Sequence, residues 1–210
     1  MLFDDRKDAG RALAALLQPY ANRADVMVLA LPRGGVPVAY EVARALQAPL
    51  DIFVVRKLGT PGHEELALGA IASGGVRVLN QDVVRDLEIG PEEIERITAR
   101  ELAELERRER QYRADRPPLE VRGCTVILID DGLATGSTMR AAVAALRRMA
   151  PAKIVVAVPV AAHATCESLR PEVDELVCAA TPDNFFAVGQ WYRSFKQVTD
   201  EEVEQLGARS

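Results

Sequence analysis

Long apolar runs, a signal segment and clustered metal ligands are all missing from this 210-residue sequence. No apolar stretch approaches the roughly 18 residues that a membrane-spanning helix needs, and the charged N-terminus lacks the apolar core of a signal peptide. The three cysteines are scattered and only two histidines occur, so no close Cys/His pair offers a metal site. We therefore expect a cytoplasmic protein with reduced thiols and no membrane partner.

Aromatic residues and positive charge are also scarce. Aromatic residues make up 5% of the chain, and 26 Lys and Arg face 31 Asp and Glu, for a net charge of −5. This balance argues against a nucleic-acid partner, because phosphate backbones reward a clustered excess of Lys and Arg, although a local basic patch stays open. Length and a 49% hydrophobic content predict a single domain over residues 1–210, with its core at about 21–180.

Short apolar, β-branched runs alternate with helical patterns along the chain. Strands are expected at 26–31, 51–55, 66–72, 76–79, 125–129, 154–160 and 176–179, and helices after Asp4 or Asp5, from Pro37, and over 91–116, 137–149 and 164–169. Strands that read as continuous apolar runs between helices are typical of a parallel sheet covered on both faces. The pattern predicts an α/β fold.

The segment 91–116 predicts one long helix that is rich in Glu early and in Arg late, as the helix dipole favours. Five apolar side chains share a stripe on its surface: Ile94, Ile97, Leu102, Leu105 and Tyr112. The stripe must cover its own domain or a second subunit. The sequence leaves both alternatives open, and the second of them would make the protein a homodimer.

In open parallel sheets, ligands bind at the carboxyl ends of the strands, and one such end is the stretch VILIDDGLATGSTM, residues 126–139. Gly132 and Gly136 allow successive N–H groups to turn toward one anion, and the helix starting near Ser137 adds free N–H groups. The stretch lacks the Lys of a Walker A loop. It predicts either a phosphate cradle or an ordinary capped strand–turn–helix junction.

Asp130 and Asp131 stand next to that cradle. Adjacent carboxylates at the end of a buried strand are costly without partners. One of them could cap the turn while the other faces solvent. A ligand rich in hydroxyl groups, or one that carries a divalent cation, explains both carboxylates better.

The stretch 126–139 resembles the phosphoribosyl pyrophosphate (PRPP) motif of the type I phosphoribosyltransferases. The segments PRGG, RKLGTPGHEE and FAVGQWY fall in the order of that family and resemble a bacterial group of phosphoribosyltransferases, most of which have no assigned acceptor. The resemblance implies a Rossmann-like, mostly parallel central sheet flanked by helices. It also implies a long inserted helix at 91–116 and a small hood at about 181–210.

The resemblance implies that the two parts of the motif bind opposite ends of one ribose 5-phosphate. Asp130 and Asp131 would hold the ribose hydroxyls, directly or through water bound to Mg²⁺. The 5′-phosphate would be held by Ala134, Thr135, Gly136, Ser137 and Thr138.

Other segments are implied to hold the pyrophosphate. The residues concerned are Arg33, Gly34, Gly35, Arg56, Lys57 and His63. The Pro32–Arg33 peptide is expected to be cis, and Gly59–Glu65 is expected to form a mobile loop over the site. PRGG could instead be a tight turn, and Arg56, Lys57 and His63 could simply be solvated.

A cluster of aromatic side chains lies near the C-terminus. Phe185, Phe186 or Trp191 could stack on a nucleobase under the hood, and we favour Phe186. The alternative is that all three pack the hood against the sheet.

The implied reaction transfers phosphoribose from PRPP to a nitrogen acceptor, a nucleobase, with Mg²⁺ as cofactor, and belongs to nucleotide metabolism. Arg33, Lys57, Asp130 and Asp131 would act through charge and positioning. Hypoxanthine-guanine members carry Asp at the position of Ala134, so the acceptor stays unnamed, and Glu64 and Glu65 are the candidates for a general acid.

Two other functions compete with this reaction. A PRPP- or nucleotide-sensing regulator on the same fold is the main alternative, because a fold does not fix a function. A dinucleotide-binding enzyme is disfavoured, because no GxGxxG follows a strand.

Overall fold

The computed structural model describes residues 3–114 and 116–208, apart from the side chains of Glu64 and Glu65. In chain order its helices and strands are α1 (Arg6–Leu16), β1 (Val26–Ala30), α2 (Gly35–Leu46), β2 (Leu50–Ile52), β3 (Val55–Thr60), β4 (His63–Ala72), β5 (Val76–Leu79), α3 (Gln81–Asp86), α4 (Pro91–Arg113), β6 (Thr125–Ile129), α5 (Ser137–Arg148), β7 (Lys153–Val160), α6 (His163–Leu169), β8 (Glu175–Ala180) and α7 (Asp200–Ala208). Within these ranges, no helix combines the length and apolar character that crossing a bilayer would require.

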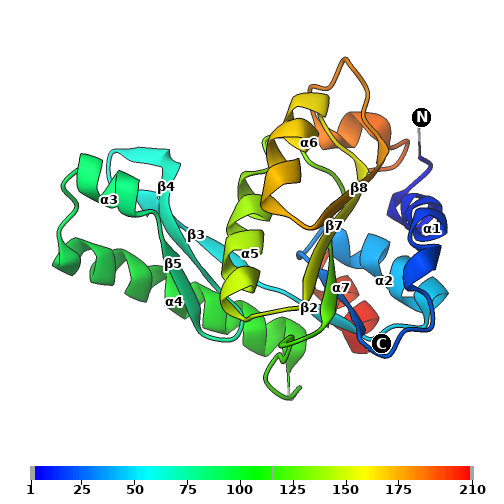
Figure 1. Ribbon diagram of the computed structural model, residues 1–210, viewed down its shortest axis with the longest axis horizontal. Coiled ribbons are helices and arrows are strands. Elements are labelled where there is room, and N and C mark those ends of the chain that lie inside the picture. Colours follow the sequence, from blue (N-terminus) through cyan, green and yellow to red (C-terminus); the bar gives the residue numbers. More distant parts are fainter. Residues whose placement is uncertain (1–2, 115, 209–210) are drawn as a thin grey trace.

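The body of the molecule is built on a five-stranded sheet in the order β2-β1-β6-β7-β8, and every pairing in it is parallel. The strands are short runs of apolar residues, and β6 is buried along its whole length. Helices α1 and α2 lie on one side of this sheet, and α5 and α6 lie on the other (Figure 1). The predicted α/β fold with a mostly parallel, doubly covered sheet is therefore confirmed.

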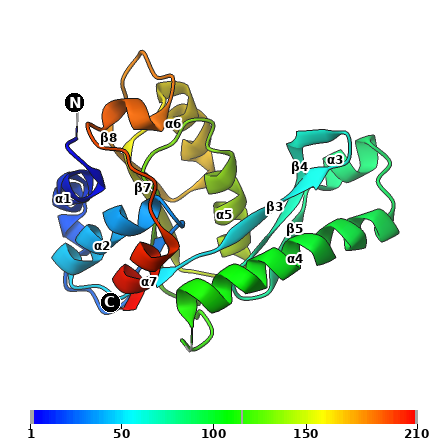
Figure 2. The same cartoon turned by 180° about the vertical axis from the view of Figure 1, so that it is seen from behind.

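A second, three-stranded antiparallel sheet, β3-β4-β5, forms an arm that extends from the body (Figures 1 and 2). Helix α4 runs along the arm and contacts β3 and β4, and α5 also contacts strands of this sheet. The strands expected at 66–72 and 76–79 are present as β4 and β5, which pair antiparallel across Ser73-Gly74-Gly75. The strand expected at 51–55 is present as β2 but has other bounds, because β2 runs from Leu50 to Ile52 and Val55 already belongs to β3 of the arm.

The segment Gly59–Glu65 is also different from its expected form. β3 and β4 pair as far as Thr60 and His63, so the segment is the end of a β-hairpin that turns at Pro61-Gly62. The sequence signal of Gly and Pro was real but marked a tight two-residue turn inside a sheet. This turn lies at the outer end of the arm (Figures 1 and 2).

The apolar stripe of α4 covers the chain's own core. Ile97, Leu105 and Tyr112 join the cluster that contains Leu58 of β3, whereas Leu102 stays 37% exposed. The helix ends at Arg113, earlier than expected. Ala114 leaves it with φ 43° before the two prolines are reached.

The C-terminal segment expected to form a hood, residues 181–210, is divided between two places in the structure. Helices α3 and α7 were not predicted, and α7 packs on α4, α2 and β2, which lie away from the end of β8. The predicted hood at about 181–210 is therefore limited to the residues between β8 and α7, which we call the hood segment.

Candidate functional site

Two loops leave the central sheet side by side. β1 and β6 are paired in register as far as Ala30 and Ile129, so the segments that follow them start at the same level. The Leu31 N–H donates to the Ile129 carbonyl at 2.9 Å, which continues the pairing one residue into the PRGG loop. The acid pair of the second loop therefore lies against the PRGG segment of the first.

The two glycines of PRGG make this contact possible. A Cβ on Gly34 would lie 2.1 Å from Oδ2 of Asp131, and a Cβ on Gly35 would lie 2.6 Å from the Ile129 carbonyl oxygen. Any larger residue would push the loop off the acids. The Pro32–Arg33 peptide is cis, as the family resemblance predicts.

The acid pair is largely withdrawn from solvent. The Asp131 N–H donates to Oδ1 of Asp130 at 2.8 Å. Burial, reinforced by the neighbouring Asp131 charge, raises the pKa of Asp130 well above its usual range. Burial also raises the pKa of Asp131, against the opposing effect of the Arg6 guanidinium. Burying two carboxylates without partners costs free energy. Hydrogen bonds from a hydroxyl-rich ligand, or a nearby cation, would lower that cost.

Arg6 is the residue that the sequence did not reveal. Its Nε donates to Oδ2 of Asp131 at 2.9 Å, across 125 residues of sequence. Tyr192 donates its hydroxyl to the Asp131 carbonyl at 2.6 Å. The only available signal was the position of Arg6 at the first turn of a helix capped by Asp5, which says nothing about the partner.

The predicted phosphate segment forms an open turn at the start of α5. Gly136 has φ 74° and precedes the first residue of the helix, whose first-turn N–H groups have no carbonyl partner within the helix. Thr165 of α6 donates its hydroxyl to the Ala134 carbonyl at 2.5 Å and braces the turn from behind. Ala134, Thr135 and Thr138 are exposed, as an anion seat requires.

Lys57 and Arg56 point in opposite directions, because successive strand residues face opposite sides of a sheet. Lys57 Nζ donates to Ser137 Oγ at 2.7 Å and so reaches the predicted phosphate segment. Arg56 instead pairs with Glu101 of α4 at 2.7 Å. The expectation that both meet one pyrophosphate is therefore corrected, since only Lys57 is brought to the site.

His63 is likewise separated from the acid pair. It is exposed and forms the last pair of the β3–β4 hairpin, several residues beyond Lys57. The candidate acids Glu64 and Glu65 lie outside the described side chains, and their role as a general acid stays a prediction.

Arg33 is held by a residue of the unpredicted helix α7. Its Nη1 lies 3.6 Å from Oδ1 of Asp200, which also accepts from the Tyr112 hydroxyl at 2.6 Å. The contact is partly exposed, so Arg33 can exchange it for an incoming anion at small cost.

The hood segment reaches the acid loop through Val188. A Cβ on Gly132 would lie 2.5 Å from Cγ1 of Val188, so the glycine again permits a close approach. Phe185 and Trp191 stack on each other with ring centroids 6.3 Å apart. Phe186 is 87% exposed, so of the three candidate rings it alone presents both faces to a ligand.

No cluster of three or more His, Cys, Asp or Glu side chains among the described residues could hold a metal by itself. The donor set still fits Mg²⁺, which is commonly bound by one or two carboxylates together with substrate phosphates and water. Asp130 and Asp131 supply the carboxylates.

Comparison with known proteins identifies the family. The family model described as phosphoribosyl transferase domain matches residues 3–192. Proteins from two strains of Mycobacterium tuberculosis, provisionally named phosphoribosyl transferases, are each 50% identical over 202 residues. These matches cover 96% of this chain and 45% of each relative, so the chain spans less than half the length of these proteins.

Solved structures share the fold. The protein TT1426 from Thermus thermophilus is 43% identical with a TM-score of 0.91, and the match covers 100% of this chain and 99% of that one. The purine phosphoribosyltransferase of Pyrococcus horikoshii is 16% identical with a TM-score of 0.50, over 92% and 93% of the two chains. With its family model matched over nearly its whole length, this chain belongs to the phosphoribosyl transferase family.

Proposed function

We propose that this chain is a phosphoribosyltransferase domain that uses PRPP and Mg²⁺ to ribosylate a nitrogen acceptor, a nucleobase, with release of pyrophosphate. One observation carries the proposal. The acid pair Asp130-Asp131 and the open turn at Gly136 lie on one loop, packed against the PRGG segment. The carboxylates that would accept from hydroxyls and the turn that would hold a phosphate are thus kept at a fixed spacing.

Each part of PRPP has a candidate partner. Asp130 and Asp131 would accept hydrogen bonds from the ribose hydroxyls, and Ala134–Thr138 would donate to the 5′-phosphate. Gly34 and Gly35 would let the backbone approach the pyrophosphate. Arg33 and Lys57 would neutralise its charge as it leaves.

The chemistry requires little beyond positioning and charge. The bond between ribose and pyrophosphate breaks through an oxocarbenium-like transition state, so negative charge grows on the leaving group. Mg²⁺, when bound, would supply positive charge at the pyrophosphate. The chain itself would contribute two things. The acid pair would hold the ribose in one orientation, and Arg33 and Lys57 would offset the charge of the leaving pyrophosphate.

The acceptor would enter from the side of the hood segment. The exposed ring of Phe186 can stack on a flat heterocycle. Ala134 offers no carboxylate to the acceptor, which fits a base that does not need proton transfer at that position. These features support a nucleobase acceptor without naming it.

The acid pair gives the direct test. We expect labelled PRPP to bind the wild-type protein in the presence of Mg²⁺ and Asp131→Asn to abolish that binding. Asp82→Asn is the matched control, because Asp82 lies in an exposed pair on α3. Unchanged PRPP affinity in Asp131→Asn would remove the proposal.

Pyrophosphate release then separates an enzyme from a sensor. A panel of nucleobases and amines is incubated with protein, PRPP and Mg²⁺, and free pyrophosphate is followed. Release with one acceptor supports the transferase. Tight PRPP binding with silence across the panel would favour a regulatory protein that senses PRPP or a nucleotide.

A further inference from the structure

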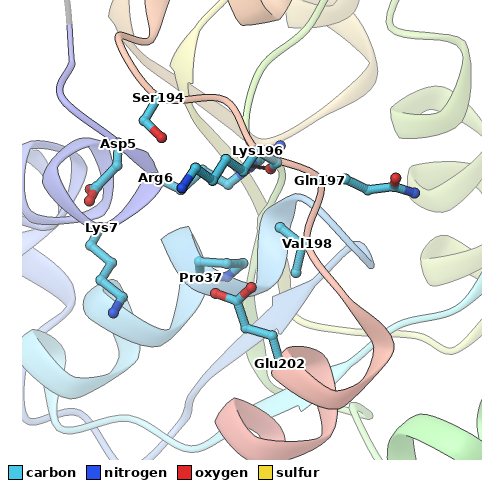
Figure 3. A pocket seen from close by; sticks show the side chains of 9 residues that line it. All are labelled: Asp5, Arg6, Lys7, Pro37, Ser194, Lys196, Gln197, Val198 and Glu202. Carbon is cyan, nitrogen blue, oxygen red and sulfur yellow. Dashed lines mark hydrogen bonds between the residues drawn. The ribbon is translucent and has the colours of Figure 1, made fainter.

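Arg6 makes contacts that no ordinary surface arginine makes. Beyond its 2.9 Å bond to Asp131, its Nη1 donates to the Lys196 carbonyl at 2.7 Å, and its guanidinium carbon lies 4.0 Å from the ring centroid of Phe195. Only 11% of the side chain is exposed. Figure 3 shows the Arg6 side chain extending from α1 to the backbone at Lys196. Stacking and two directed bonds fix the plane of the guanidinium.

The start of α1 is itself held in place. The Phe3 N–H donates to the Trp191 carbonyl at 3.0 Å, and the Arg193 N–H donates back to the Phe3 carbonyl at 2.9 Å. Asp5 caps the helix by accepting from the Asp8 N–H. The position of Arg6 therefore follows from the pairing of Phe3 with the segment 191–193 and from the cap at Asp5.

The Asp131 side chain depends on Arg6 for its orientation. Arg6 is the positively charged side chain that donates to the Asp131 carboxylate, whereas Tyr192 donates to the main-chain oxygen of Asp131. Asp130 accepts from the Asp131 backbone N–H, and its carboxyl group also interacts with the Asp131 carboxyl group, but it brings no positive charge to it. A carboxylate has four acceptor positions, so the single bond to Oδ2 leaves positions for a ribose hydroxyl.

We propose that Arg6 is a positioning residue that fixes the Asp131 carboxylate toward a ribose hydroxyl. This rests on the proposed function, in which Asp131 meets the ribose. Arg6 also offsets the repulsion between two adjacent carboxylates, so both stay in the loop without a ligand. Its contribution is specific to the ribose end of the ligand, since its contacts involve Asp131 and the C-terminal segment and none reaches the phosphate turn.

Replacement of Arg6 should leave the protein folded. The side chain borders a cavity of about 240 Å³ lined mainly by polar and charged residues: Asp5, Arg6, Lys7, Pro37, Ser194, Lys196, Gln197, Val198 and Glu202 (Figure 3). Water can occupy the space that a shorter side chain leaves. Arg6→Met removes the charge and the directed bonds, and Arg6→Lys keeps the charge without the planar fork.

The test compares three small ligands by calorimetry: ribose 5-phosphate, 2-deoxyribose 5-phosphate and inorganic phosphate. In Arg6→Met we expect affinity for ribose 5-phosphate to fall about ten- to a hundredfold, the loss of one charge-assisted bond, with inorganic phosphate unchanged. The preference for ribose over deoxyribose should shrink, and Arg6→Lys should restore part of it. Arg11→Met, an exposed arginine on the same helix, is the control.

Equal losses for all three ligands, or no loss for any, would overturn the inference. If the wild-type protein binds none of them, the proposed function fails instead. The inference is then decided by the side-chain carboxyl carbon resonance of Asp131 at neutral pH. A resonance that shifts or broadens in Arg6→Met but not in Arg11→Met supports positioning by Arg6, and an unchanged resonance rejects it.

Discussion

Single residues set the contact between the two loops of the site. Gly34 matters through the side chain it lacks, because the space where a Cβ would stand is taken by the Asp131 carboxylate. That carboxylate cannot swing aside freely, since Arg6 holds its Oδ2 atom. The acid pair itself was evident from the sequence. Its partner Arg6 was not, because no local pattern encodes a contact across 125 residues.

Gly34→Ala should therefore disturb the ligand site more than the fold. The added Cβ would lie 2.1 Å from Oδ2 and 2.7 Å from Cγ of Asp131, so the loop or the carboxylate must move. We expect PRPP affinity to fall at least about tenfold and the free energy of unfolding to drop by about 1–3 kcal/mol. Calorimetry and urea unfolding measure the two effects.

Gly90→Ala is the control for this substitution. A Cβ at Gly90 would meet nothing within 4 Å, and its φ of −71° suits any residue. Wild-type PRPP affinity in Gly34→Ala would show that the two loops do not act as one site.

At the scale of elements, the arm decides which basic side chain serves the site. The alternation of β3 places Lys57 on the α5 side and Arg56 on the α4 side, with Leu58 packed on the same core as α4. Arg56 and Lys57 looked equivalent in the sequence because the expected strand ended at residue 55, just before both of them. In a strand, unlike in a loop, successive side chains alternate between the two faces of the sheet.

Lys57→Met and Arg56→Met should consequently differ in kind. Lys57→Met should weaken PRPP binding about ten- to a hundredfold, because a charge at the phosphate loop is lost. Arg56→Met should leave binding within about twofold and lower the free energy of unfolding by about 1–2 kcal/mol, since Glu101, 12% exposed, loses its main partner. Binding isotherms and urea unfolding of both variants provide the measurement.

The two variants control for each other. A comparable loss of PRPP affinity in both would mean that the strand faces exchange when ligand binds, and the assignment of Lys57 would no longer follow from this structure.

For the whole molecule, one ion pair joins the arm helix to the central sheet. Arg113 at the end of α4 donates to both oxygens of Asp51 in β2 at 3.0 Å and is 9% exposed on its side chain. The hydrogen bonds to the Asp51 carboxylate raise the pKa of Arg113. Arg116 approaches the same carboxylate at 3.4 Å. Together with the packing of α5 on the arm strands, this ion pair ties the arm to the body.

Arg113→Met should loosen that junction. We expect the free energy of unfolding to fall by about 1–3 kcal/mol, less than for a fully isolated buried charge because Arg116 still faces Asp51. Amide hydrogen exchange in β3–β5 should accelerate more than exchange in β6 and β7. Arg110→Met, whose side chain is 72% exposed, should change neither. Uniform acceleration across both sheets would contradict a junction role.

Sequence patterns were enough to predict the alternation of strands and helices, the glycine-rich turn before α5, the acid pair and the family, because each of these is a local pattern of residue types. Its periodicity also placed the long helix and the apolar stripe upon it. What the tertiary structure alone decided was the set of partners. It showed that α4 covers the chain's own core, that Arg56 and Lys57 separate, and that Arg6 reaches Asp131. Such pairings depend on strand register and on where the two ends of the described chain meet, and neither is encoded in neighbouring residues.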